Sequence, residues 1–261
     1  MNFRWIPRVF LLLVSCEMGL FASEPAGEHR VLFIGNSMIG GATPRHLQGF
    51  VRAAGGTWTI ESLLKAGGDL RETAYGKGLP VTERIREGNW TEVVFVQGTA
   101  YWFDQMKTEA QKTRNADQTI EASLTLHRLI AAQGARTVVF MSYPHQPEPD
   151  RRNHAGIEAV HWRQKTRLDA EPVEGKRSAT LLVPVGPLWI RGAGKFGEDT
   201  WYKNERHGNE IAYYASACLF YTYLTGHDPR PLSYNGPLLP EDAAWIRSQA
   251  WDLFTNYRPP Q

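Results

Sequence analysis

A serine and a histidine that lie far apart in the sequence could act together as nucleophile and base. Ser37 follows the apolar run Val31–Ile34 and the pair Gly35-Asn36, so it is expected at the carboxyl end of a buried strand. Open α/β sheets bind their ligands at that edge, and a serine there can be a nucleophile if a base reaches it. The alternative is that Ser37 only caps the next helix or closes a turn.

His207 is the histidine best placed to serve as that base. It lies in Lys203–Asn209, after the last expected strand and directly before a helix expected at 210–224. A histidine in a loop at a helix entry can swing toward the rim of the sheet. The alternative, a solvated loop histidine, stays open. His46, by contrast, is expected on the outer face of the first helix.

Strand and helix signals alternate along the chain and must position these residues. Alternating and apolar segments predict strands at 31–34, 58–63, 92–96, 137–141 and 180–185. Helical patterns with caps and closing glycines predict helices at 44–54, 80–87, 116–133, 157–168, 210–224 and 240–254. Alternation of this kind indicates a parallel sheet covered on both faces, in one domain spanning residues 28–258.

Several glycines follow the expected strands. Gly68, Gly98 and Gly186 each come after a strand, at the same edge of the sheet as Ser37. Backbone N–H groups from such turns could hold an oxyanion.

Composition and motif spacing exclude several other functions. Lys plus Arg is 29 and Asp plus Glu is 27, a net charge of +2, which argues against nucleic acid as partner. No glycine-rich nucleotide-binding run follows a strand, and no cluster of His, Cys and Asp has metal-ligand spacing. We therefore expect no metal and no cofactor.

The first 23 residues are expected to be an export leader. Arg4 and Arg8 are followed by the apolar run Val9–Ser15, which is too short to span a bilayer. Leu13–Cys16 also resembles a bacterial lipobox, in which Cys16 would carry the lipid. A lipid-anchored and a free secreted protein, periplasmic or extracellular, both remain open. Cys218 is then left without an intramolecular disulfide partner and is expected to be a small buried hydrophobe.

Four motifs, in order, resemble the blocks of the SGNH (GDSL-type) hydrolases. Ile34–Met38 looks like the first block with G-N-S, Ala66–Asp69 is similar to the second, and Gln97–Ala100 stands where the third should be. Asn204–Leu224 resembles the final block, and Val183–Trp189 resembles the segment before it in an exported bacterial branch. The resemblance implies a flavodoxin-like, three-layer α/β/α fold with a central five-stranded parallel sheet. It also implies a metal-independent ester hydrolase, often one that removes acetyl groups from carbohydrates.

The resemblance implies roles for individual residues, with a departure at the catalytic acid. Ser37 and His207 would be the catalytic pair. The acid expected three residues before the histidine is replaced by Asn204, which carries no charge. Glu205, Asp199 or a backbone carbonyl could replace it.

A second departure concerns the oxyanion donors. The N–H groups of Ser37 and Gly68 would hold the oxyanion. In the third block, one alignment places Ala100 at the asparagine position, whereas Gln97 or Thr99 could supply the missing donor.

The expected substrate is a small-molecule or carbohydrate ester. Asn36, Tyr101 and Trp102 are expected to contact it, with Phe103 beside them. Because both departures weaken the catalytic pattern, a rival hypothesis is an SGNH-fold protein that binds a glycan or peptide with impaired catalysis.

Overall fold

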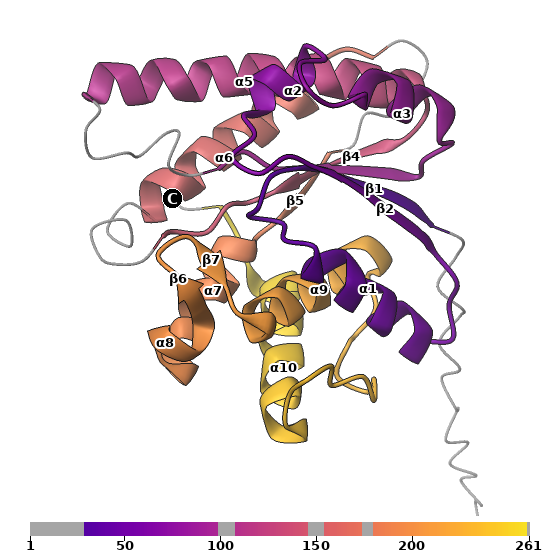
Figure 1. Ribbon diagram of the computed structural model, residues 1–261, viewed down its shortest axis with the longest axis vertical. Helices are drawn as coiled ribbons and strands as arrows, with labels where there is room; N and C mark the ends of the chain where they lie inside the picture. Colours follow the sequence, from indigo (N-terminus) through magenta and orange to yellow (C-terminus); the bar gives the residue numbers. More distant parts are fainter. Residues whose placement is uncertain (1–28, 99–107, 146–153, 174–179, 260–261) are drawn as a thin grey trace, which may run out of the picture.

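The computed structural model describes residues 29–98, 108–145, 154–173 and 180–259. Its centre is a five-stranded sheet in the order β2-β1-β3-β4-β5, with every neighbouring pair parallel (Figure 1). The strands are β1 (Arg30–Gly35), β2 (Thr59–Leu64), β3 (Glu92–Phe95), β4 (Arg136–Phe140) and β5 (Leu181–Val183). The predicted α/β fold with five parallel strands is confirmed.

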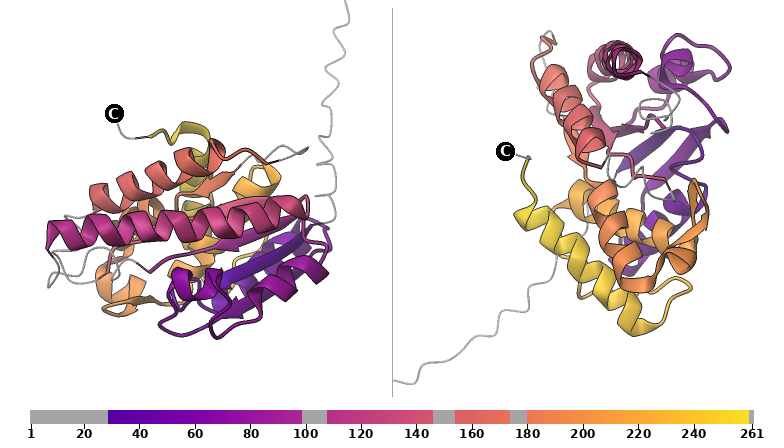
Figure 2. Two further views of the ribbon diagram at one scale, coloured as in Figure 1. Left: turned by 90° about the horizontal axis from the view of Figure 1, so that it is seen from above. Right: turned by 90° about the vertical axis from the view of Figure 1, so that its left-hand side faces the viewer.

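Helices cover both faces of this sheet, and side chains alternate between the two layers (Figures 1 and 2). Val31 and Phe33 of β1 join one core cluster, whereas Leu32 and Ile34 join the other. Strands buried on both faces need apolar residues at every position, which explains the continuous apolar run. The first layer holds α1 (Ala42–Ala53), α7 (Val185–Phe196), α9 (Glu210–Thr225) and α10 (Pro240–Asn256). The second layer holds α2 (Leu70–Ala74), α3 (Val81–Glu87), α5 (Glu109–Ala132) and α6 (His154–Asp169).

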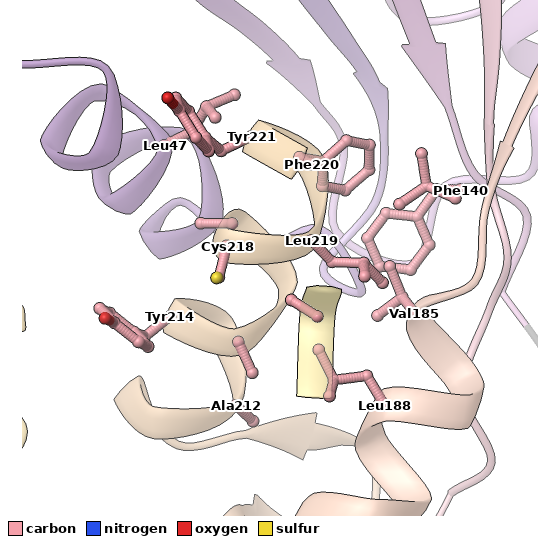
Figure 3. Packing of buried hydrophobic residues seen from close by; sticks show 14 of the residues in the cluster. Leu47, Phe140, Val185, Leu188, Ala212, Tyr214, Cys218, Leu219, Phe220 and Tyr221 are labelled. Carbon is pink, nitrogen blue, oxygen red and sulfur yellow. The ribbon is translucent and has the colours of Figure 1, made fainter. Parts of the chain in front are cut away.

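α9 is the most deeply buried helix of the first layer. Phe220 packs edge-on against Phe33, with ring centroids 5.2 Å apart, and also contacts Phe140 (Figure 3). The predicted burial of Cys218 is confirmed, since its side chain is fully buried in this helix. Burial raises the pKa of its thiol, so Cys218 behaves as a small apolar side chain.

α5 begins seven residues earlier than predicted, and α7 was not predicted; both differences have local reasons. α5 begins at Glu109 rather than Ala116, because Thr108 and Gln111 form a capping box that satisfies its first N–H groups. Gly186-Pro187, expected to be a turn, lies in the first turn of α7. Proline is tolerated there because the first N–H groups of a helix have no intrahelical partner.

Short elements were not predicted. They are α2, α8 (Glu198–Trp201) and an antiparallel hairpin of β6 (Tyr202–Asn204) and β7 (His207–Gly208). The hairpin matters most for the site, because His207 is the first residue of β7 and is not part of an irregular loop.

α1 and α9 pack side by side beneath the sheet (Figure 1). His46 of α1, expected on the outer face, is instead only 3% exposed. Its Nε2 lies 2.8 Å from Glu210 Oε2 at the start of α9, and its Nδ1 lies 2.8 Å from the Tyr234 hydroxyl. Burial lowers the pKa of His46, so the neutral ring donates from Nε2 to the carboxylate and accepts from Tyr234. This bond fixes the start of α9 against α1.

Among the described residues, no helix combines the length and the apolar character needed to cross a membrane.

Candidate active site

Ser37 lies in the turn that joins β1 to α1. At Gly35 an added Cβ would stand 2.5 Å from Val96 Cγ1, so only glycine lets the end of β1 pack this closely beside the chain after β3. Asn36 is 5% exposed. Its Oδ1 accepts the Met38 N–H and its Nδ2 donates to the Gly68 carbonyl, both at 3.0 Å. Asn36 therefore connects the loops after β1 and β2, and because it also lines the cavity beside Ser37, its contact with substrate stays a prediction.

His207 reaches Ser37 from the β6–β7 hairpin. The distance from His207 Nε2 to Ser37 Oγ is 2.8 Å, and His207 Nδ1 lies 3.0 Å from Asn204 Oδ1. An amide oxygen only accepts hydrogen bonds, so Nδ1 carries the hydrogen and Nε2 presents its lone pair to the Ser37 hydroxyl. That is the tautomer a general base requires.

The orientation of the Asn204 amide is set by the backbone. The same Oδ1 also accepts the N–H groups of Arg206 and His207, each at 3.0 Å. Turning the amide around would place its NH2 group against two N–H donors, which is unfavourable. Asn204, and not Glu205 or Asp199, makes the bond to Nδ1. Among the described residues, no carboxylate lies within ion-pair distance of the His207 ring.

A cavity of about 370 Å³ opens beside the Ser37–His207 pair. Its wall is built from the loops that follow β1, β2, β3 and β4 and from the hairpin. The described residues lining it are Asn36, Ser37, Met38, Gly67, Gly68, Asp69, Gln97, Gly98, His145, Arg206 and His207. A second depression, of about 650 Å³, shares Ser37 and His207 with it and is lined on its far side by Arg45, Lys203 and Tyr213.

The oxyanion donors only partly follow the expectation. The Gly68 N–H already donates to the Lys65 carbonyl at 2.9 Å, in a turn that needs the positive φ of 66° at Gly67. Gln97 Oε1 accepts the Leu70 N–H at 2.7 Å, which leaves its NH2 group as the donor of that side chain. The Ser37 N–H makes no hydrogen bond to another described residue. The Ser37 N–H and the Gln97 amide are thus two donors that the described lining of the cavity offers.

Residues that the sequence analysis did not select also line the cavity. His145 and Arg206 both face it, and burial, aided by the charge of Arg206, lowers the pKa of His145 to about 4. Their positions depend on loop paths, although Arg206 stands directly beside the expected base. Thr99, Tyr101, Trp102 and Phe103 lie outside the described residues. No group of three or more His, Cys, Asp or Glu side chains in the described part of the chain is arranged to hold a metal ion.

Comparisons with known proteins identify the architecture. No protein-family model matches the chain, and no curated protein matches it. Among solved structures, a DUF4886 family protein from Bacteroides uniformis ATCC 8492 is similar with a TM-score of 0.69 at 13% identity, covering 88% of this chain and 95% of that one. A putative SGNH hydrolase from Slackia heliotrinireducens has a TM-score of 0.56 at 15% identity, with coverages of 76% and 99%. The chain has the fold of the SGNH hydrolases. A variant of an acetyl xylan esterase from Geobacillus stearothermophilus shares it, with a TM-score of 0.52, 13% identity and coverages of 75% and 94%.

In this SGNH fold, Tyr143 bridges the two loops that carry Ser37 and His207. It follows β4 and is fully buried, with its ring stacked on Trp189 at a centroid distance of 3.3 Å. Its hydroxyl lies 3.3 Å from the Met38 carbonyl and 3.4 Å from the Arg206 carbonyl. These residues are the immediate neighbours of Ser37 and His207. The long distances make each bond weak, so we infer a role in alignment more than in stability.

Changing Tyr143 to phenylalanine is expected to lower kcat about tenfold, with little change in KM, because the pair loses alignment while the cavity keeps its shape. Steady-state kinetics on an acetyl ester checks this. Tyr223→Phe is the matched control, since the Tyr223 hydroxyl donates a hydrogen bond to the Leu253 carbonyl at 3.1 Å, away from the cavity. Equal losses of kcat in both variants would contradict the alignment role.

A buried chain of hydrogen bonds supports the loop after β4 in the same fold. The Ser142 N–H donates to His161 Nε2 at 2.9 Å, and Gln164 Oε1 accepts from His161 Nδ1 at 3.0 Å. Gln164 in turn donates to Ser123 Oγ at 2.6 Å. Burial lowers the pKa of His161 to about 4, so the ring is neutral at neutral pH.

The free energy of unfolding is therefore expected to fall as the pH drops from about 6.5 to about 4. Unfolded His161 binds a proton near its ordinary pKa of 6.5, whereas the folded ring resists protonation until its pKa of about 4. A proton on Nε2 would also oppose the Ser142 N–H. The difference is worth about 3 kcal/mol for one such ring.

Urea titrations across this pH range measure the effect. His161→Gln keeps an acceptor for Ser142 and removes the titrating group, so it should flatten part of the pH dependence. The remainder comes from other buried histidines such as His145. A pH profile unchanged by His161→Gln would show that His161 is not the cause.

Proposed function

We propose that this protein is a serine ester hydrolase that removes acetyl groups from carbohydrates or other small esters. The observation that carries the proposal is the 2.8 Å contact between Ser37 Oγ and His207 Nε2, with Nδ1 held by Asn204. The fold adds support, because acetyl xylan esterases are among the solved structures with the same architecture.

The proposed reaction has two acyl-transfer steps. His207 Nε2 takes the proton of Ser37 as Oγ attacks the ester carbonyl, and the imidazolium then protonates the leaving alcohol. The Ser37 N–H and the Gln97 amide are the proposed oxyanion donors, each worth about 3 kcal/mol in the transition state. Water, activated by the same imidazole, then releases the acid and restores Ser37. None of these steps calls on a cofactor.

Two measurements on the purified protein test the proposal. Acetate release from acetylated xylo-oligosaccharides or an aryl acetate should be catalytic, and an organophosphonate should label Ser37 with one equivalent per chain. Labelling elsewhere, or acetate release without labelling, would contradict the role of Ser37.

The second candidate is a glycan- or peptide-binding protein with impaired catalysis. The neutral Asn204 in place of an acid favours it, because no charge stabilises the imidazolium. Glycan binding by calorimetry, with neither ester turnover nor Ser37 labelling, would establish this candidate.

We also propose export, with the leader either removed or lipidated at Cys16. Cell fractionation and palmitate labelling, compared with Cys16→Ala, test the two forms. A cytoplasmic full-length protein would rule both out.

A further inference from the structure

The charges of the described residues that line the Ser37 cavity are not balanced. Among the described residues that line it, Asp69 is the sole carboxylate and Arg206 the sole arginine or lysine. Asp69 is already neutralised by Arg71, which donates its backbone N–H at 2.9 Å and its Nε at 2.8 Å. The Arg206 guanidinium makes neither an ion pair nor a hydrogen bond with another described residue. The described lining of the cavity therefore carries one positive charge that no described carboxylate pairs with.

The backbone of Arg206 is held at a fixed place relative to the reacting atoms. The Arg206 N–H donates to Asn204 Oδ1 at 3.0 Å, and its carbonyl lies 3.4 Å from the Tyr143 hydroxyl. The same Asn204 oxygen holds His207, and Arg206 and His207 are adjacent in the chain. The backbone from which the guanidinium extends is thus part of the structure that aims the base at Ser37.

The other described residues on this side of the cavity add no second positive charge to its lining. His145 is 8% exposed, and the nearby Arg206 charge helps burial to lower its pKa. A neutral imidazole remains at neutral pH. Lys203, on the same hairpin, lines the other depression and not this cavity. Among the described residues, Arg206 is thus the one arginine or lysine that lines the cavity formed by Ser37 and the glycine-rich loops.

Serine acyl transfer on a neutral ester gives no role to such a cation. An arginine fork matches a carboxylate with two parallel hydrogen bonds, and it holds its charge at every physiological pH. We propose that the cavity takes esters that carry a carboxylate, such as O-acetylated uronic acids, and that Arg206 binds the carboxylate. This inference rests on the proposed function. The carboxylate is not a reactant: the acetyl group moves to Ser37 and then to water, and the acidic sugar leaves unchanged.

Paired substrates that differ only in charge test it. The wild-type protein should hydrolyse an O-acetylated methyl glucuronide with about tenfold higher kcat/KM than the matching methyl glucoside, and added salt should reduce this preference. Arg206→Gln should lower kcat/KM for the acidic substrate about tenfold more than for the neutral one. Lys203→Gln removes the same charge from the same hairpin and should keep the preference. Equal effects of the two variants, or a preference that survives Arg206→Gln, would overturn the assignment.

The carboxylate could belong to the alcohol or to the acyl group of the ester. 4-Nitrophenyl hemiglutarate carries a carboxylate on its acyl group, and 4-nitrophenyl pentanoate does not. Faster hydrolysis of the hemiglutarate would show that the cavity binds the carboxylate of the acyl group. Hydrolysis of neutral aryl acetate without charge preference in either pair would refute the role of Arg206 and leave the esterase proposal intact.

A binding measurement makes the test independent of turnover. Calorimetry with Ser37→Ala should show an acidic oligouronide bound more tightly than a neutral xylo-oligosaccharide, and adding Arg206→Gln should remove the difference. Equal affinities for both sugars would count against Arg206 even if no ester were hydrolysed.

Discussion

Changing Ser37 to alanine is expected to lower kcat for acetyl ester hydrolysis by about ten-thousand-fold or more, to the background rate. The hydroxyl that faces His207 at 2.8 Å would be lost, and no covalent intermediate could form. His207→Ala should cost about as much, and the double variant should be no slower, because the two groups act as one unit. Steady-state kinetics and organophosphonate labelling measure both effects.

Ser62→Ala is the control for Ser37→Ala. Ser62 is exposed on the edge strand β2, so its removal should leave both turnover and labelling unchanged. Circular dichroism and thermal unfolding should show that all variants remain folded. Full activity in folded Ser37→Ala would eliminate the serine mechanism.

Changes at Asn204 are expected to have the next largest effects. Asn204→Leu removes the oxygen that accepts from His207 Nδ1 and from two backbone N–H groups. The ring then loses both its tautomer and its orientation. We expect kcat to fall about a hundredfold to a thousandfold.

Asn204→Asp should act in the opposite direction. In a serine protease, replacing the triad aspartate by asparagine lowers kcat about ten-thousand-fold through the wrong tautomer, which is an established example of this effect. Here the backbone donors already orient the amide oxygen toward Nδ1, so the tautomer is correct. The carboxylate adds only its charge, which stabilises the imidazolium. We therefore expect a gain of about tenfold to a hundredfold in kcat.

The neighbouring carboxylate supplies the control for both changes. Glu205→Gln should leave kcat unchanged, because Glu205 does not make the bond to His207 Nδ1. A large loss in Glu205→Gln, together with no response to Asn204→Asp, would assign the acid role to Glu205 instead.

Much of the architecture was predictable because its signals are local. Unbroken apolar runs located strands such as β1, and the Ala- and Tyr-rich segment after Asn209 located α9. Gly186-Pro187 misled the prediction, because a proline can close a turn or stand in the first turn of a helix. The hairpin of β6 and β7 is too short to show a period of two, so it could not be found in advance.

Residues of the candidate site could be predicted from the sequence only where a recognisable motif surrounds them. Ser37 and His207 are flanked by recognisable blocks, and the structure brings their side chains into contact. Tyr143 and Arg206 could not be selected in this way, because their contact depends on how distant segments of the chain pack together. The burial of His46 could not be predicted either, because its polar partners Glu210 and Tyr234 lie more than 160 positions away in the sequence.

The direction of β1 governs how the protein can present its cavity to the surroundings. The strand is six residues long, so about 17 Å separate its first residue from its last. Arg30 begins it and Ser37 follows its far end. Any tether joined to the chain before Arg30 is thus attached at the opposite edge of the sheet from the reacting serine. A protein held at a membrane by that tether would turn its opening outward, toward polymers arriving from the surrounding medium.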